Sequence, residues 1–140
     1  MGAMDRRSTI KLGLVAAVAP ALAVSRPAGA AMYGPDEGRE LAEGVRQIDL
    51  TESHSMIPGY GRVSMRDIVW QPGAKTSNPS MPNDMICHIV EGELEIDQGD
   101  GNPFVARTGD VWTCAKGTPE TTTNASSAPA AMRVIDMHPA

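Results

Sequence analysis

Short segments that alternate between apolar and polar residues occupy most of the chain beyond residue 44. Their alternation and β-branched content predict strands, and no long segment with the 3.6-residue period of a helix follows the first 30 residues. Clusters of Gly, Pro, Asn and Asp separate the segments, as expected for turns. Many short strands at regular spacing predict an all-β sandwich or barrel. The predicted strands are residues 44–50, 61–70, 85–90, 93–97, 104–107, 110–114, 119–124 and 131–137.

The N-terminal third differs from this pattern. Basic residues at 6, 7 and 11 precede an apolar run at 12–24, and Ala28-Gly29-Ala30 fits a cleavage site for a signal peptidase. The whole segment resembles a twin-arginine export signal, with an ordinary secretory signal as the alternative. The resemblance implies a periplasmic or secreted protein that crosses the membrane already folded.

Residues 1–3 look like a remnant of cloning. We expect a signal over 1–30, and an arm plus first strand over 31–59. Within that arm, residues 38–44 could form one helical turn.

The negative net charge of the chain excludes two classes of function. The chain has a net charge of −5, and removing residues 1–30 leaves eight basic and sixteen acidic side chains, a net charge of −8. Such a surface repels phosphate backbones and anionic headgroups, which excludes nucleic-acid and membrane-surface roles. A domain of about 110 residues buries a modest core and often gains stability by dimerising, so we expect a homodimer.

Three motifs follow in order along the second half of the chain. They are Gln71-Pro72-Gly73, the hairpin HIVEGELEI at 88–96, and GDVWTCAKGTPETTTN at 109–124. Together they resemble the two conserved motifs of the cupin family. The resemblance implies a single-domain double-stranded β-helix, the cupin jelly-roll barrel, over residues 60–140.

The same resemblance identifies where cupins place their metal ligands. The four positions fall at Pro79, Met81, Met85 and Glu120, whereas cupins usually have three histidines and one glutamate there. The usual iron, manganese or nickel site is therefore not implied, and neither are the chemistries that depend on it.

Sulfur side chains gather around these positions. Strand alternation places Met85 and Cys87 on one face and His88 on the other, and the resemblance makes the first face the barrel interior. It also places the strand of Cys87 beside the strand of Cys114. Four alternatives stay open. They are a soft-metal site, most simply Cu(I), built from Met81, Met85 and one or both cysteines; a Cys87–Cys114 disulfide; a metal-free pocket for a small apolar ligand; and an enzyme site built on Glu120 and a cysteine.

The two functional hypotheses differ in the role that they give to Glu120. A carboxylate inside the barrel needs a cation, hydrogen-bond donors or a proton, unless it turns to the barrel mouth near Lys116. The first hypothesis is an exported cupin that binds a soft metal or a small molecule through Met81, Met85, Cys87, Cys114 and Glu120. The second is a cupin-type enzyme that acts on a small organic substrate with Glu120 as acid or base. The cofactor is a copper ion in one version of the first hypothesis and absent in the others.

Overall fold

The computed structural model describes residues 31–140, which form ten β-strands. The export signal predicted over 1–30 lies outside the described residues. Residues 31–140 contain no helix long and apolar enough to cross a membrane. The strands are β1 (Arg39–Ala42), β2 (Val45–His54), β3 (Tyr60–Trp70), β4 (Lys75–Asn78), β5 (Asp84–Glu91), β6 (Glu93–Asp97), β7 (Phe104–Arg107), β8 (Val111–Cys114), β9 (Glu120–Thr123) and β10 (Ala130–Pro139).

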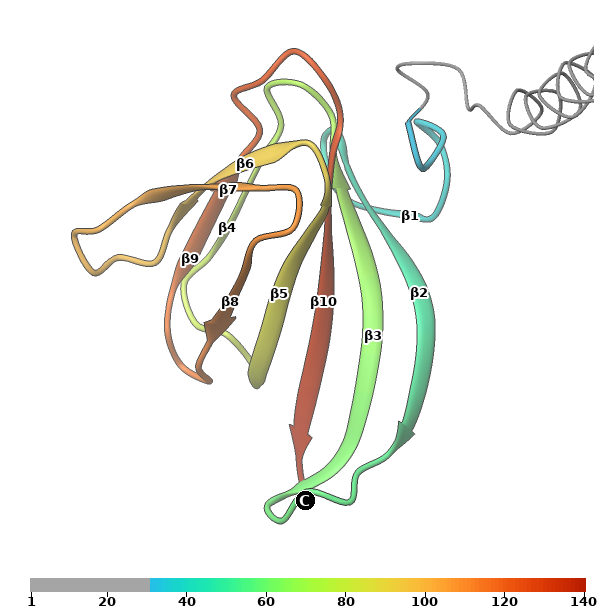
Figure 1. Cartoon of the computed structure of the whole chain (residues 1–140), viewed down its shortest axis with the longest axis vertical. Helices are drawn as coiled ribbons and strands as arrows, with labels where there is room; N and C mark the ends of the chain where they lie inside the picture. The colour runs from blue at the N-terminus through green and yellow to red at the C-terminus, as the bar shows by residue number, and fades with distance from the viewer. Residues whose placement is uncertain (1–30) are drawn as a thin grey trace, which may run out of the picture. The chain divides into compact units, whose positions relative to one another are not determined.

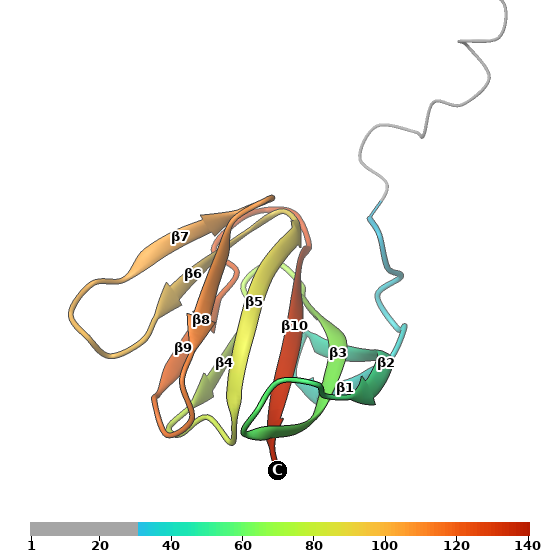
Figure 2. The same cartoon turned by 60° about the horizontal axis from the view of Figure 1, so that its bottom comes forward.

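The strands form two antiparallel sheets that face each other (Figures 1 and 2). The larger sheet has the order β1-β2-β3-β10-β5-β8, and the smaller has the order β4-β9-β6-β7. The last strand, β10, thus lies in the middle of the larger sheet, between β3 and β5. This arrangement confirms the predicted all-β jelly roll.

Every predicted strand is present within a few residues of its expected bounds, and the structure adds two. Residues 39–42 pair with β2 as strand β1, so the helical turn expected at 38–44 is wrong. Residues 75–78 pair with β9 as strand β4, within a segment predicted to be a loop. Both added strands have four residues, and neither carries the alternation of apolar residues by which the other strands were found.

One glycine shows why the hairpin motif has its form. Gly92 joins β5 to β6 with φ of 72°, a backbone conformation that other residues rarely adopt. A Cβ atom at this position would lie 2.7 Å from the carbonyl oxygen of Pro129, just before β10. Gly92 therefore permits both the tight turn between β5 and β6 and the close approach of the loop that leads into β10.

Alternation on β5 confirms the predicted faces. Met85, Cys87 and Ile89 are buried between the sheets, whereas His88 is half-buried and its Nδ1 atom lies 3.0 Å from the carbonyl oxygen of Asp110. Side chains from β3, β5, β6 and β10 complete an apolar core around them. The inner face of the larger sheet therefore supplies most of the wall of the interior site.

Candidate functional site

A partly open cavity of about 220 Å³ lies between the two sheets, and Leu41 of β1 is at its edge. One wall is apolar and belongs to β3 and β10, while β4 and β9 contribute hydroxyl, amide and carboxylate groups. The side chains from these four strands are Arg66, Ile68, Trp70, Thr76, Ser77, Asn78, Glu120, Thr122, Met132 and Val134.

Four of the five residues predicted for the site line this cavity. Met81, Met85 and Cys87 bring three sulfur atoms to it, and Glu120 brings a carboxylate. Cys114 is also buried, and its thiol contacts Glu120 although it is not part of the cavity wall. The five residues that the sequence grouped as one site therefore lie in or directly beside one cavity.

Glu120 begins β9 and is only 6% exposed. Its Oε2 atom accepts hydrogen bonds from the Cys114 thiol at 2.8 Å and from Trp112 Nε1 at 3.3 Å. Gln98 Nε2 donates to the same oxygen at 3.3 Å, and the Thr122 hydroxyl donates to Oε1 at 3.2 Å. These donors replace the water that burial removes, so the carboxylate needs no cation to stay inside. The alternative in which Glu120 turns outward to Lys116 is not observed.

The two cysteines are free in the structure. The β5–β8 register pairs Met85 with Cys114 and Cys87 with Trp112, so the cysteines are diagonal neighbours. A hydrogen bond with the Cys114 thiol and burial in the interior raise the pKa of Cys87 far above its usual value. Cys87 is therefore a neutral thiol at physiological pH, close to a second thiol.

Three donors around Glu120 were not predicted from the sequence: Gln98, Trp112 and Thr122. Gln98 was placed in a turn between strands, where nothing distinguishes a side chain that reaches inward. Trp112 lies in the strand predicted over residues 110–114, and its ring packs edge-on against Phe104 with centroids 5.6 Å apart. Its indole N–H, however, donates to Glu120. A buried carboxylate needs donors, which is the one signal that could have suggested Trp112.

The metal centre usual in cupins does not fit these residues. Of the four corresponding positions, Pro79 is exposed and has no donor atom, and two others are methionines. Within residues 31–140, no group of three or more His, Cys, Asp and Glu side chains is placed to hold a metal ion. The site instead offers thioethers and a thiol beside one hydrogen-bonded carboxylate. Sulfur ligands of this kind favour soft metal ions such as Cu(I) over iron, manganese or nickel.

Comparison with known proteins supports the fold. Residues 65–129 match the family model of the EutQ-like cupin domain. No curated protein matches the sequence of this chain.

Several solved structures superpose over most of the described chain. The Cupin_2 domain of an XRE family transcriptional regulator from Enterobacter cloacae is 18% identical, with a TM-score of 0.55 over 69% of this chain and 99% of that chain. An RmlC-like cupin from Shewanella frigidimarina is 16% identical, with a TM-score of 0.56 over 72% and 81%. KdgF from Halomonas sp. is 15% identical, with a TM-score of 0.55 over 71% and 84%. Identities this low show the fold alone. The family model covers somewhat less than half of the chain, and the solved structures show that residues 31–140 have the cupin fold.

Proposed function

We propose that this chain is a cupin binding protein that holds a small organic molecule in the cavity between its sheets. The observation that carries the proposal is a cavity with one apolar wall, formed by β3 and β10, and one fixed carboxylate, Glu120, on the opposite side. Ligand sites typically combine predominantly apolar walls with a few polar groups that set orientation. Here the neutral donors around Glu120 hold its carboxylate in place, while Met85 and Met132 offer adaptable apolar surface.

A direct test is to purify the full chain, unfold it, and identify released small molecules by mass spectrometry. Val134→Phe should reduce the amount released, because the larger side chain fills the cavity that Val134 lines. Val105→Phe is the matched control, since Val105 is exposed on the other sheet. A chain that releases nothing, and that binds no member of a fragment set in ligand-observed NMR, would contradict the proposal.

A soft metal ion is the second candidate, because Met81, Met85 and Cys87 line one cavity. Cu(I) prefers thioether and thiolate ligands. Since the raised pKa keeps Cys87 protonated, binding must release a proton and should weaken as the pH falls. Elemental analysis of the purified chain should then give about one copper ion per chain, lost in Met85→Leu and Cys87→Ser. Copper that stays bound in both variants would exclude this site.

Enzymatic activity is distinguished by Glu120→Gln. The amide keeps the shape of the side chain and removes its capacity to exchange a proton. A variant that still binds a substrate but no longer converts it would favour a cupin-type enzyme with Glu120 as acid or base.

Export is proposed from residues 1–30 alone. The arginine pair, the apolar run and the Ala-Gly-Ala sequence support cleavage after Ala30 and a periplasmic or secreted location. N-terminal sequencing of the protein expressed in a bacterium with an intact export pathway should find Ala31 as the first residue. Replacing Arg6 and Arg7 with lysine should retain the precursor in the cytoplasm if the twin-arginine route is used.

A further inference from the structure

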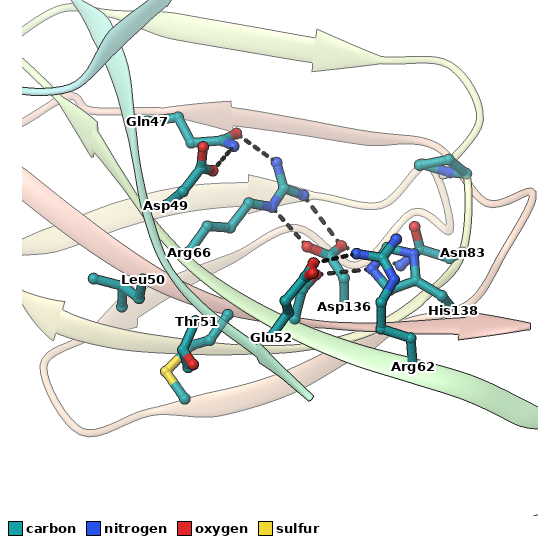
Figure 3. Close-up of a pocket in the computed structure, with 13 residues that line it drawn as sticks. Gln47, Asp49, Leu50, Thr51, Glu52, Arg62, Arg66, Asn83, Asp136 and His138 are labelled. Atoms are coloured by element: carbon teal, nitrogen blue, oxygen red, sulfur yellow. Dashed lines mark hydrogen bonds and ion pairs between the residues drawn. The ribbon is translucent and has the colours of Figure 1, made fainter. Parts of the chain in front are cut away.

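A second cavity, which we call the outer basin, lies on the same face of the larger sheet. It has a volume of about 560 Å³, within the usual range of about 300–1,000 Å³ for ligand pockets. The lower parts of β2, β3 and β10 and the Pro82-Asn83 loop form it, where these strands extend past the smaller sheet in Figure 1. Figure 3 shows that its side chains are mostly polar and charged.

Arg66 lines both the outer basin and the 220 Å³ cavity between the sheets, which we call the inner cavity. On β3, Arg62 and Ser64 precede it in the basin, and Ile68 and Trp70 follow it in the inner cavity. Strand β10 shows the same division, since His138 and Asp136 line the basin while Val134 and Met132 line the inner cavity. The inner face of the sheet therefore changes from polar to apolar at Arg66, and the two cavities adjoin there.

A hydrogen-bonded network fixes the polar groups at this boundary. Arg66 donates to both carboxylate oxygens of Asp136, at 2.8 and 3.3 Å, and to Gln47 Oε1 at 2.9 Å. Asn83 Nδ2 donates to Asp136 at 3.1 Å. Gln47, Asn83 and Asp136 are each at least 94% buried, so their positions are set before any ligand arrives. Within residues 31–140 the side-chain oxygen of Asn83 accepts no hydrogen bond, which leaves an acceptor at the basin.

The charges of the two cavities do not balance. Arg66 is paired with Asp136, and Arg62 is paired with Glu52. Asp49 in the basin and Glu120 in the inner cavity have only neutral hydrogen-bond partners among the described residues. Two negative charges therefore remain, one in each cavity, and they disfavour an anionic ligand.

We propose that the inner cavity and the outer basin are two halves of one site for a small amphipathic molecule. The apolar part of the molecule lies between β3 and β10 in the inner cavity. Its polar end, a hydroxyl or an ammonium group, lies in the outer basin beside Asn83 and the Arg66–Asp136 pair. The proposal rests on the binding function proposed above and adds the class of ligand to it.

Three probes of equal length test the ligand class: n-hexylammonium, 1-hexanol and hexanoate, titrated into the full chain by isothermal calorimetry. The ammonium and the alcohol should bind at least about tenfold more tightly than the carboxylate. In a series of ammonium probes from butyl to hexyl, the affinity should rise roughly fourfold per methylene, from about 0.8 kcal/mol per buried CH₂. Hexanoate binding as tightly as hexanol would overturn the proposal.

Two variants test whether the basin takes part. Asp49→Asn changes only the charge of an exposed side chain and should weaken n-hexylammonium binding roughly two- to fivefold while sparing 1-hexanol. Asn83→Ala should weaken both probes, because it removes the free acceptor. The matched controls are Asp100→Asn and Asn102→Ala, in the turn between β6 and β7, which should bind both probes as the parent chain does.

The outcomes separate this proposal from the binding function itself. If 1-hexanol binds and Val134→Phe blocks it, but neither basin variant changes either probe, the inner cavity is a binding site and the two-part site is wrong. If none of the probes binds and the chain releases no small molecule, the binding function fails as well.

Discussion

At the scale of single residues, the hydrogen bonding of the interior depends on one acceptor, the carboxylate of Glu120. Glu120 occupies a position at which cupins usually have a histidine, and neutral donors from two other segments converge on it. The thiol of Cys114, the indole of Trp112 and the amide of Gln98 all donate to the same oxygen. Hydrogen bonds to a charged group contribute more than those between neutral groups. Glu120 therefore connects β8, β9 and the turn after β6, besides facing the cavity.

Removing that acceptor should destabilise the fold. Glu120→Ala leaves the buried thiol and the indole N–H without a partner, and we expect a loss of about 2–3 kcal/mol in the free energy of unfolding. Urea denaturation followed by tryptophan fluorescence measures this change. Glu95→Ala, on an exposed side chain of β6, should change the unfolding free energy by less than about 0.5 kcal/mol. Equal effects of the two substitutions would mean that the donors around Glu120 find other partners.

Tyr33 should make stability depend on pH in the alkaline range. Burial and a hydrogen bond from its hydroxyl to Asp67 raise the pKa of Tyr33 to about 12, against about 10 for an unfolded chain. The neutral phenol is thus favoured in the folded state, so its contribution is complete below pH 10 and is lost between pH 10 and 12. Urea midpoints measured at pH 9, 10, 11 and 12 should fall less steeply for Tyr33→Phe than for the parent chain. Parallel curves would show that the phenol does not titrate in this way.

At the scale of elements, the register between β5 and β8 decides how the sulfur atoms meet. Directly opposed residues have Cα atoms about 4.5–5.5 Å apart, whereas diagonal neighbours are about 7–8 Å apart. Disulfides need Cα atoms within about 6.8 Å. Cys114 is opposite Met85 and only diagonal to Cys87. This geometry favours two free thiols even under oxidising conditions.

An engineered cysteine should reveal the register. In Met85→Cys, combined with Cys87→Ser, the new cysteine lies directly opposite Cys114 and should form a disulfide. The parent chain should keep two free thiols. Thiol titration in guanidinium chloride and mass spectrometry of unreduced peptides measure both states. A disulfide between Cys87 and Cys114 in the parent chain would show that the strands approach more closely at this diagonal.

The elements also show how far the sequence alone could lead. Alternation located β3, β5 and β10 because each buries one apolar face. Strands β1 and β4 could not be found in this way, since they are short and mostly exposed. Met81, Met85 and Glu120, which the resemblance to cupins grouped as one site, line one cavity, because those positions are tied to the glycines of the motifs. The outer basin was not foreseen, since it joins β2, β3 and β10, and pairing across such distances in sequence is not visible in a local pattern.

At the scale of the whole molecule, the outer face of the larger sheet suggests how two copies could associate. Half-buried apolar side chains run across its three middle strands. They are Val63 on β3, Ile135 and Met137 on β10, and Ile86 on β5. Met137 pairs with Val63 on one side and Ile135 pairs with Ile86 on the other, so the row crosses all three strands. A continuous apolar surface on a small domain is typical of an association site.

We therefore expect a homodimer that uses this face. Light scattering after size-exclusion chromatography should give about twice the mass of one chain for the parent protein. Ile135→Glu should give the mass of one chain, because a charge in the middle of the apolar row cannot be solvated within the interface. Val105→Glu, on the other sheet, should leave the mass unchanged. A parent protein that is monomeric at about 100 µM would contradict the expectation.

The central position of β10 has a consequence for the order of events during synthesis. Until residues 130–139 have been made, β3 and β5 have no strand between them, and each has an unpaired edge that can pair with another chain. The larger sheet can close only after almost all of the domain has left the ribosome. The contacts of β10 link residues between 40 positions apart, as for Ala131 and Glu91, and 79 positions apart, as for Pro139 and Tyr60. Folding is then slow and comes after translation, in the manner of proteins with high contact order. During that interval the chain is most exposed to aggregation, and a chaperone that covers the gap between β3 and β5 would protect it most.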